Sequence, residues 1–180
     1  MSEPLEFTLT RYPEPVLRKV ASPVEAFDEQ LRQTVDAMYK LMFRSSGVGI
    51  AAPQVGLKQR ILVLNSEGDP EKPELNLTLV NPRIVDRSGD PTRYDEGCLS
   101  FPGIYAEIER PDHCTVEAFD IEGNEIRGEY SGFISRIIQH EYDHLEGILL
   151  VDRMSPADKT RNRAALDELI HEYKTARARG

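Results

Sequence analysis

Apolar residues recur at helical spacing in three stretches of the chain. The first stretch predicts a helix over residues 28–44, with Asp28 as its N-cap. The second predicts a helix over residues 131–147 that Gly147 ends in a left-handed conformation, and the third predicts a helix over residues 155–178. The positions expected to be buried in the first and third helices are Leu31, Val35, Met38, Met42, Leu166, Leu169, Ile170 and Tyr173.

Short apolar or alternating stretches lie between the first two predicted helices and indicate strands. They cover residues 60–65, 77–85, 104–110, 114–120 and 125–130. A tight turn at residues 122–124 joins the last two strands, whereas the glycine-rich residues 47–59 and the polar residues 66–74 are expected to be loops. The pattern therefore predicts a mixed, mostly antiparallel sheet.

Length and charge limit what the chain can be. Its 180 residues suit a single domain covering residues 1–180. The 31 acidic and 22 basic side chains give a net charge of −9, which argues against a broad nucleic-acid surface. The basic end of the last predicted helix is interpreted as a solvated tail, because cations suit the negative end of a helix dipole. We therefore expect no direct sequence-specific nucleic-acid binding.

The N-terminal residues have neither a basic start nor an apolar stretch, and no apolar run is long enough to span a membrane. We therefore expect a cytoplasmic protein with no membrane partner. In that setting Cys98 and Cys114 are expected to remain thiols. Cys114 lies in a strand-like stretch and is interpreted as a small core residue, whereas glycine and turn residues surround Cys98.

Residues 140–144 form an H-E-x-x-H motif on the second predicted helix. Because His140 and His144 are four residues apart, their imidazoles lie on one face and can reach one metal ion. Glu141 lies about 100° further round the helix, close enough to act as a general base toward a water molecule at the metal. The competing interpretation is a polar surface, but the helix is rich in apolar residues and buried imidazoles need partners.

A hydrolytic metal usually has three protein ligands, so a third residue is needed. Leu150 occupies the position at which metzincin proteases carry their third histidine. Glu168 or Glu172 on the last predicted helix would supply the ligand in a thermolysin-like zinc endopeptidase. Cys98 is the competing candidate, because backbone N–H groups in its glycine-flanked turn would stabilise a thiolate.

The glycine-rich stretch at residues 47–56 is a weak match to a dinucleotide-binding fingerprint. That fingerprint needs a strand before it and a helix after it, and here the predicted order is reversed. Small residues instead let a peptide backbone approach closely, and Gln54 adds an amide donor beside it.

Three motifs taken together resemble the signature motifs of the peptide deformylase family. They are GVGIAAPQ at residues 47–54, EGCLS at residues 96–100 and QHEYDH at residues 139–144. The resemblance extends over most of the chain. It implies an α+β fold in which mixed, mostly antiparallel sheets pack around a central helix that carries the H-E-x-x-H motif, with a C-terminal helix.

The resemblance also implies a reaction and a cofactor. The reaction is removal of the N-formyl group from the initiator N-formylmethionine of nascent polypeptides, with release of formate. The implied metal ligands are Cys98, His140 and His144. They would hold one divalent ion, expected to be iron(II), with zinc, nickel or cobalt as substitutes.

Catalytic and substrate-binding residues follow from the same resemblance. Glu141 would be the general base, and the Gln54 side-chain amide and the Leu99 backbone N–H would donate to the developing oxyanion. Plain core packing is the competing interpretation for Val48 and Ile137. The residues implied to bind the peptide are Val48, Gly49, Gly97, Tyr105, Arg136 and Ile137.

Residues near the implied metal ligands carry further expectations. Glu96 is expected to pair with Arg110 and brace the metal-binding turn, while Asp143 either helps to orient a ligand or is solvated. Tyr105 stands where many bacterial deformylases have an arginine, and the surrounding stretch resembles the subtype found in plant organelles and some bacteria.

The implied partners are the nascent formyl-Met polypeptide and, transiently, the ribosome, with the chain as a monomer or weak dimer. A bacterial cytosolic enzyme is favoured over an organellar precursor. The non-enzymatic alternative is a relative that binds N-formyl peptides without hydrolysing them.

Overall fold

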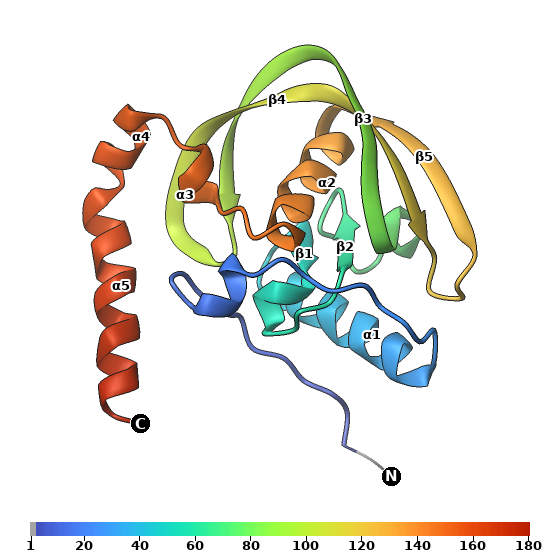
Figure 1. Cartoon of the computed structure of the whole chain (residues 1–180), viewed down its shortest axis with the longest axis horizontal. Coiled ribbons are helices and arrows are strands. Elements are labelled where there is room, and N and C mark those ends of the chain that lie inside the picture. Colours follow the sequence, from blue (N-terminus) through green and yellow to red (C-terminus); the bar gives the residue numbers. More distant parts are fainter. Residues whose placement is uncertain (1–2) are drawn as a thin grey trace.

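The computed structural model describes residues 3–180 and has the α+β architecture expected from the sequence (Figure 1). Its strands are β1 (Gly49–Ala51), β2 (Ile61–Asn65), β3 (Asn76–Cys98), β4 (Phe101–Phe119) and β5 (Glu125–Ser131). Its α-helices are α1 (Glu29–Arg44), α2 (Gly132–Leu145), α3 (Leu150–Arg153), α4 (Pro156–Arg161) and α5 (Arg163–Ala178). Short 3-10 helices lie in the connections at η1 (Pro15–Arg18), η2 (Ala52–Val55) and η3 (Pro73–Leu75).

All five strands form one antiparallel sheet in the order β1-β2-β3-β4-β5, so each strand pairs with its neighbours in the sequence. The first strand, β1, pairs with β2 alone among the described residues and is therefore an edge strand. Its outer side presents backbone N–H and C=O groups that can pair with another extended chain. Within residues 3–180, parallel pairing is limited to an isolated bridge between Ser22 and Gln59.

The hairpin of β3 and β4 is much longer than the sequence pattern predicts. The strands expected at 104–110 and 114–120 are one continuous strand, and the strand expected at 77–85 continues to Cys98. Register shifts between Ser88 and Pro91 and at three other points accommodate turn-like residues within the pairing. Residues 85–95 are exposed and are held together by backbone pairing. They therefore show no pattern of buried apolar positions from which a strand could be predicted.

Helix α2 lies beneath the arch that β3 and β4 form (Figure 1). Most of its residues from Ser135 to Leu145 are buried, and Ile137, Ile138 and Leu145 pack against the sheet. Gly147 ends the helical segment at φ 72°, and a Cβ there would come within 2.6 Å of the Arg18 carbonyl oxygen. Glycine is therefore required both for the left-handed turn and for this close contact.

Helix α1 begins as predicted. The Asp28 side chain accepts a hydrogen bond from the Leu31 backbone N–H at 3.0 Å, and the helix ends at Arg44. Its buried face packs against β1 and β2. The expected loop at residues 47–59 contains β1 and η2, which are too short and too rich in glycine and alanine to produce a strand or helix pattern.

The C-terminal helix expected over residues 155–178 is divided at Asn162 into α4 and α5. The Asn162 side chain donates to the carbonyl oxygens of Tyr105 and Asp158, both at 3.0 Å, so a tertiary contact holds the break. Leu166 and Leu169 are buried as predicted. Ile170 and Tyr173 are only half-buried, because α5 contacts the rest of the molecule along a narrow stripe beside β4 (Figure 1).

None of the helices within residues 3–180 combines the length and the apolar character that crossing a membrane would require.

Removing volume from the buried face of α2 should destabilise the fold. Ile138 is fully buried, whereas Ile134, one turn earlier, is 37% exposed. We expect Ile138→Ala to lower the free energy of unfolding by about 2–5 kcal/mol, because it leaves a cavity between α2 and the sheet. The matched change Ile134→Ala should lower it by about 1 kcal/mol or less. Chemical denaturation at equal metal content measures both, and equal losses would contradict this packing.

Candidate metal centre and active site

Helix α2 and the end of β3 bring three ligand-type side chains together. His140 and His144 lie one turn apart on α2, with ring centroids 5.4 Å apart. The Cys98 sulfur lies 3.3 Å from Nε2 of His144. One ligand atom from each of the three residues falls within 4.8 Å of the others. This group therefore joins residues that are far apart in the sequence.

The three side chains fit a divalent metal ion. Nδ1 of His140 lies 2.9 Å from the Glu96 carboxylate, which leaves Nε2 of His140 free to bind a metal. The cysteine sulfur contacts the corresponding nitrogen of His144, so sulfur and imidazole nitrogens converge at one place. One sulfur and two nitrogens form a ligand set that suits iron, zinc and related ions, with room for a further ligand.

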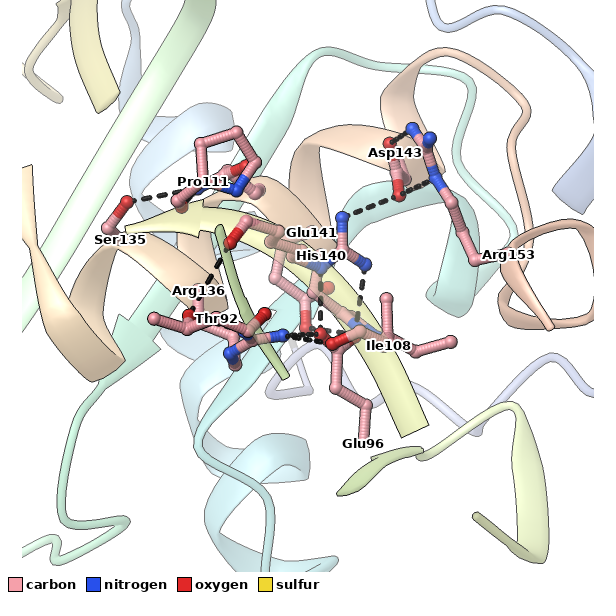
Figure 2. Close-up of polar contacts among 12 residues, drawn as sticks. Thr92, Glu96, Ile108, Pro111, Ser135, Arg136, His140, Glu141, Asp143 and Arg153 are labelled. Carbon is pink, nitrogen blue, oxygen red and sulfur yellow. Dashed lines mark hydrogen bonds and ion pairs between the residues drawn. The ribbon is translucent and has the colours of Figure 1, made fainter. Parts of the chain in front are cut away.

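Glu96 lies at the centre of a buried charge network (Figure 2). Its carboxylate accepts hydrogen bonds from Nε and Nη2 of Arg110 at 2.7 and 3.0 Å and from Nη1 of Arg136 at 2.6 Å. Its Oε1 also contacts Nδ1 of His140. Glu96 is on β3, Arg110 is on β4, and Arg136 and His140 are on α2. One carboxylate thus links three elements and orients a metal-ligand candidate.

The same contacts fix the charge of Glu96. Burial alone would raise the pKa of its carboxyl group, but the hydrogen bonds from His140 and Arg110 and the positive charge of Arg110 outweigh this effect. The pKa of Glu96 is therefore held well below its usual range. An ionised Glu96 accepts a hydrogen bond from the Nδ1–H of His140, which directs the other ring nitrogen toward the ligand cluster.

Asp143 extends this network away from the metal centre. It is buried and accepts hydrogen bonds from Arg110 at 3.0 Å and from Arg153 at 2.8 and 3.1 Å. Of the two alternatives for this residue, the solvated side chain is therefore wrong. Asp143 acts on the metal centre indirectly, because it holds Arg110, which holds Glu96.

The two imidazoles differ in their electrostatic surroundings. Burial would lower the pKa of His140, but hydrogen bonds with Cys98 and Glu96 raise it well above its usual value. Burial lowers the pKa of His144 well below its usual value, and the positive charges of His140 and Arg110 act in the same direction. Nδ1 of His144 is buried and has no hydrogen-bond partner among residues 3–180.

The Glu141 side chain lies beside the metal-ligand candidate His140. It is buried, its Oε2 has no hydrogen-bond partner within the described residues, and its Oε1 lies 4.0 Å from Nε2 of His140. Burial raises the pKa of Glu141 to about 7. A carboxyl group with a pKa near neutrality can both take up and release a proton during a reaction.

Close packing holds Glu141 against the edge strand. A Cβ built on Gly49 of β1 would lie 3.0 Å from Oε1 of Glu141 and 2.7 Å from Cγ2 of Ile137. Only glycine lets the backbone of β1 come this close to α2. The glycine at position 49 therefore keeps an extended backbone next to the buried carboxylate.

A cavity of about 660 Å³ opens beside these residues and is lined by Cys98, His140 and Glu141. The other lining residues include all six that were expected to bind peptide, namely Val48, Gly49, Gly97, Tyr105, Arg136 and Ile137. The sequence thus identified side chains and backbone segments that the fold brings to one cavity. A volume of this size suits a small-molecule or short-peptide site.

Comparison with known proteins places this geometry in a family. The sequence profile of the family described as polypeptide deformylase matches residues 7–160. The chain belongs to this family. The surroundings of Tyr105 had pointed to the subtype found in plant organelles and some bacteria, and plant proteins of type 1B are among the relatives.

The individual relatives differ in how much of their length is shared. Peptide deformylase 1B of Arabidopsis thaliana, described as chloroplastic/mitochondrial, is 43% identical over 92% of this chain, which spans 60% of that protein. Peptide deformylase of Cellvibrio japonicus is 41% identical over 89% of this chain and 93% of its own length. A crystal structure of the Plasmodium falciparum peptide deformylase has a TM-score of 0.91 and 40% identity, covering 93% of this chain and 98% of that one.

Membership of the deformylase family agrees with the placement of the ligand candidates. Glu168 and Glu172, which would complete a zinc endopeptidase site, are exposed on α5. Within residues 3–180, the group of potential ligands around the two histidines contains Cys98 and neither of these glutamates. The endopeptidase alternative therefore lacks its third ligand.

Two aromatic residues that the sequence pattern did not reveal also line the cavity. Tyr94 on β3 and Phe133 on α2 line it with ring centroids 5.6 Å apart, and the Arg136 guanidinium lies 5.5 Å from the Tyr94 ring. The rings are 49% and 40% exposed, which is unusual for large apolar side chains. Tyr94 precedes the EGCLS motif by only two residues, but Phe133 has the spacing of an ordinary core position.

Arg136 also has a role that its expected place in a methionine pocket did not reveal. Its guanidinium is buried and donates to Glu96, to the Ile108 carbonyl oxygen at 3.1 Å and to the backbone and side-chain oxygens of Thr92 at 2.8 and 2.9 Å. Arg136 thus lines the cavity, and its guanidinium ties α2 to β3 and β4 (Figure 2).

Neutralising Glu96 should weaken metal binding. Glu96→Gln replaces the ionised acceptor of His140 with a neutral amide. It leaves Arg136 without its buried counter-charge and Arg110 with only that of Asp143. We expect the dissociation constant for zinc to rise by about 10–100-fold, as measured by competition with a chromogenic chelator. The matched change Glu109→Gln, on an exposed position of β4, should leave it unchanged. An unaltered zinc affinity in Glu96→Gln would contradict the orienting role.

Proposed function

We propose that this chain hydrolyses the N-formyl group of the initiator N-formylmethionine in nascent polypeptides and releases formate and a free amine. The observation that carries the proposal is the convergence of Cys98, His140 and His144 beside the buried carboxylate of Glu141. Membership of the polypeptide deformylase family supports the same reaction. We further propose that residues 1–180 act as one catalytic domain.

Cys98, His140 and His144 would hold one divalent ion in this proposal. When bound, the ion supplies a Lewis acid that polarises the formyl oxygen and makes hydroxide available from water near neutral pH. We propose iron(II) as the ion, with zinc, nickel or cobalt as substitutes, because a mixed sulfur and nitrogen ligand set accepts all four.

Glu141 would carry the proton during the reaction. Its carboxylate takes a proton from water as oxygen attacks the formyl carbon, and it later delivers that proton to the leaving nitrogen as the C–N bond breaks. One molecule of water is thereby divided between formate and the amine. The raised pKa of Glu141, at about 7, suits both directions of transfer.

Gln54 and Leu99 would stabilise the negative charge that grows on the formyl oxygen. The Gln54 side-chain nitrogen lies 3.6 Å from the Cys98 sulfur, so an amide donor faces the ligand cluster. The Leu99 N–H belongs to the residue that follows Cys98 in the turn between β3 and β4. Donors placed in advance at such a position typically each contribute about 10²–10³ in kcat.

The peptide would bind as an extended chain along β1. The free edge of this strand, with Gly49, and the end of β3, with Gly97, present backbone groups to the cavity. Val48 and Ile137 would surround the methionine side chain, with the Arg136 stem beside them. Tyr105 is 57% exposed at the cavity and would contact the residues that follow methionine.

The partners and location of the chain complete the proposal. We propose a transient contact with the ribosome, where nascent formyl peptides emerge, and a monomer or weak dimer. Both Cys98 and Cys114 are free thiols in the structure, a state that suits a reducing compartment such as the cytoplasm.

Removing the general base should abolish turnover while metal stays bound. We expect Glu141→Gln to lower formate release from a formyl-Met peptide by at least about 10²-fold, because the glutamine amide cannot take up the proton that Glu141 would carry. An anaerobic assay with iron-loaded protein and metal analysis of the same sample tests this. Glu172→Gln, on the exposed face of α5, should be unaffected. Robust turnover by Glu141→Gln would contradict the role.

The variant Cys98→Ala distinguishes the deformylase proposal from the endopeptidase alternative. Cys98→Ala should lose both its bound metal and its formate release, because two imidazoles alone hold a divalent ion weakly. Cys114→Ala makes the same change at a buried cysteine away from the ligand cluster and should retain both. A Cys98→Ala protein that keeps its metal and cleaves internal peptide bonds would support the endopeptidase. Stable binding of formyl-Met peptide without turnover in the wild type would instead support a binding protein.

A further inference from the structure

Ser100 is a fully buried serine two residues after Cys98, and the assignments above give it no role. Its hydroxyl oxygen lies 2.7 Å from the Thr10 carbonyl oxygen and 3.2 Å from the Gln54 side-chain nitrogen. It therefore stands between the N-terminal segment and the amide that would face the formyl oxygen. Gln54 is itself 1% exposed, so water has little access to this contact.

The number of available protons fixes the direction of each hydrogen bond. A carbonyl oxygen can only accept, so the Ser100 hydroxyl must donate its single proton to Thr10. The Ser100 oxygen is then left as an acceptor and requires an N–H from Gln54. The amide must present its NH2 group to Ser100 and not its oxygen.

A second contact imposes the same orientation on Gln54. Its Oε1 accepts a hydrogen bond from the Ala51 backbone N–H at 2.9 Å. An amide rotated by 180° would place its nitrogen against the Ala51 N–H and its oxygen against the Ser100 oxygen, which would lose both hydrogen bonds in a buried site. In the observed orientation, the Gln54 side-chain nitrogen also donates toward the Cys98 sulfur, with 3.6 Å between the two atoms.

We propose that Ser100 is a positioning residue that holds the Gln54 side chain with its N–H directed at the reacting formyl oxygen. This inference rests on the proposed deformylase function. Ser100 itself does not touch the substrate. It acts by accepting a hydrogen bond from one N–H of the Gln54 amide, so that the other N–H is available to the oxyanion.

Residues 10–12 make hydrogen bonds with both the Gln54 and the Ser100 backbone. The Thr10 N–H donates to the Gln54 carbonyl oxygen at 2.7 Å, and the Tyr12 N–H donates to the Ser100 carbonyl oxygen at 3.0 Å. The Tyr12 ring also stacks on Phe101, with centroids 4.9 Å apart. Residues 10–12 therefore hold the Gln54 and Ser100 segments together, although none of the three metal-ligand candidates lies within residues 10–12.

The expected kinetic effect of Ser100→Ala is smaller than that of losing an oxyanion donor, because the Gln54 amide remains in this variant. Loss of one preorganised oxyanion donor typically lowers kcat by about 10²–10³-fold. Ser100→Ala keeps the Gln54 amide but removes one of its two restraints, so we expect a smaller loss in kcat, on the order of 10-fold. KM should be unchanged within about twofold, because the negative charge develops only in the transition state.

A double-mutant cycle tests the inference in iron-loaded protein under anaerobic conditions. Formate release from a formyl-Met peptide is measured for the wild type, Ser100→Ala, Gln54→Ala and the double variant. We expect Ser100→Ala to lower kcat in the wild type and to have no further effect once Gln54 is absent. Ser135→Ala removes an equally buried serine hydroxyl from α2 and should leave kcat unchanged.

A structural readout accompanies the kinetics and does not depend on turnover. In zinc-loaded, ¹⁵N-labelled protein, the Gln54 side-chain NH2 signals should be protected from solvent exchange in the wild type and in Ser135→Ala. They should lose protection in Ser100→Ala. If Ser100→Ala does not fold, Ser100→Gly removes the same hydroxyl, and its signals are compared in the same way.

The outcomes separate the two proposals. An unchanged kcat in Ser100→Ala, an equal loss in the Gln54→Ala background, or retained NH2 protection would overturn the positioning role while wild-type formate release stands. A wild type that releases no formate would overturn the proposed function, and the exchange measurement would still decide whether Ser100 orients Gln54.

Discussion

A single buried carboxylate, that of Glu96, determines how the strand that carries Cys98 meets the helix that carries His140. Charged groups are costly to bury unless they are paired, and removing one member of a buried pair typically costs about 3–5 kcal/mol. Arg110 and Arg136 pair with Glu96 from a neighbouring strand and from the helix, and His140 contacts the same carboxylate. These shared contacts link β3, β4 and α2, the elements beside and within which the metal-ligand candidates lie.

The proposed chemistry requires a second, contrasting environment next to this network. Glu96 is kept ionised by its basic partners, whereas Glu141, on the other side of His140, lies in an apolar and poorly hydrogen-bonded site where its pKa rises to about 7. In the proposed mechanism the two carboxylates thus have different tasks: Glu96 orients a ligand candidate and Glu141 exchanges a proton. The close approach of β1 at Gly49 keeps Glu141 in this environment and places an extended edge strand within reach of it.

The sequence was informative where side-chain spacing reflects local geometry. The H-E-x-x-H spacing placed His140 and His144 on one helix face, and the Asp28 cap and the Gly147 turn marked helix ends correctly. It was less informative where tertiary contacts decide the structure. Backbone pairing extends the exposed middle of the β3–β4 hairpin, and the contact from Asn162 to β4 divides the C-terminal helix. The same limit hid the exposed Tyr94 and Phe133 rings and the buried guanidinium of Arg136, since only the folded chain brings these groups to one cavity.

The central claim is that one sulfur and two imidazole nitrogens bind the same divalent ion. X-ray absorption at the iron edge, recorded on anaerobically iron-loaded protein, tests this claim most directly, because sulfur and nitrogen scatter differently at their bonding distances. We expect one sulfur neighbour and nitrogen or oxygen neighbours for each bound iron, and no bound iron in Cys98→Ala. An iron site in the wild type that is surrounded by nitrogen and oxygen alone would contradict the account.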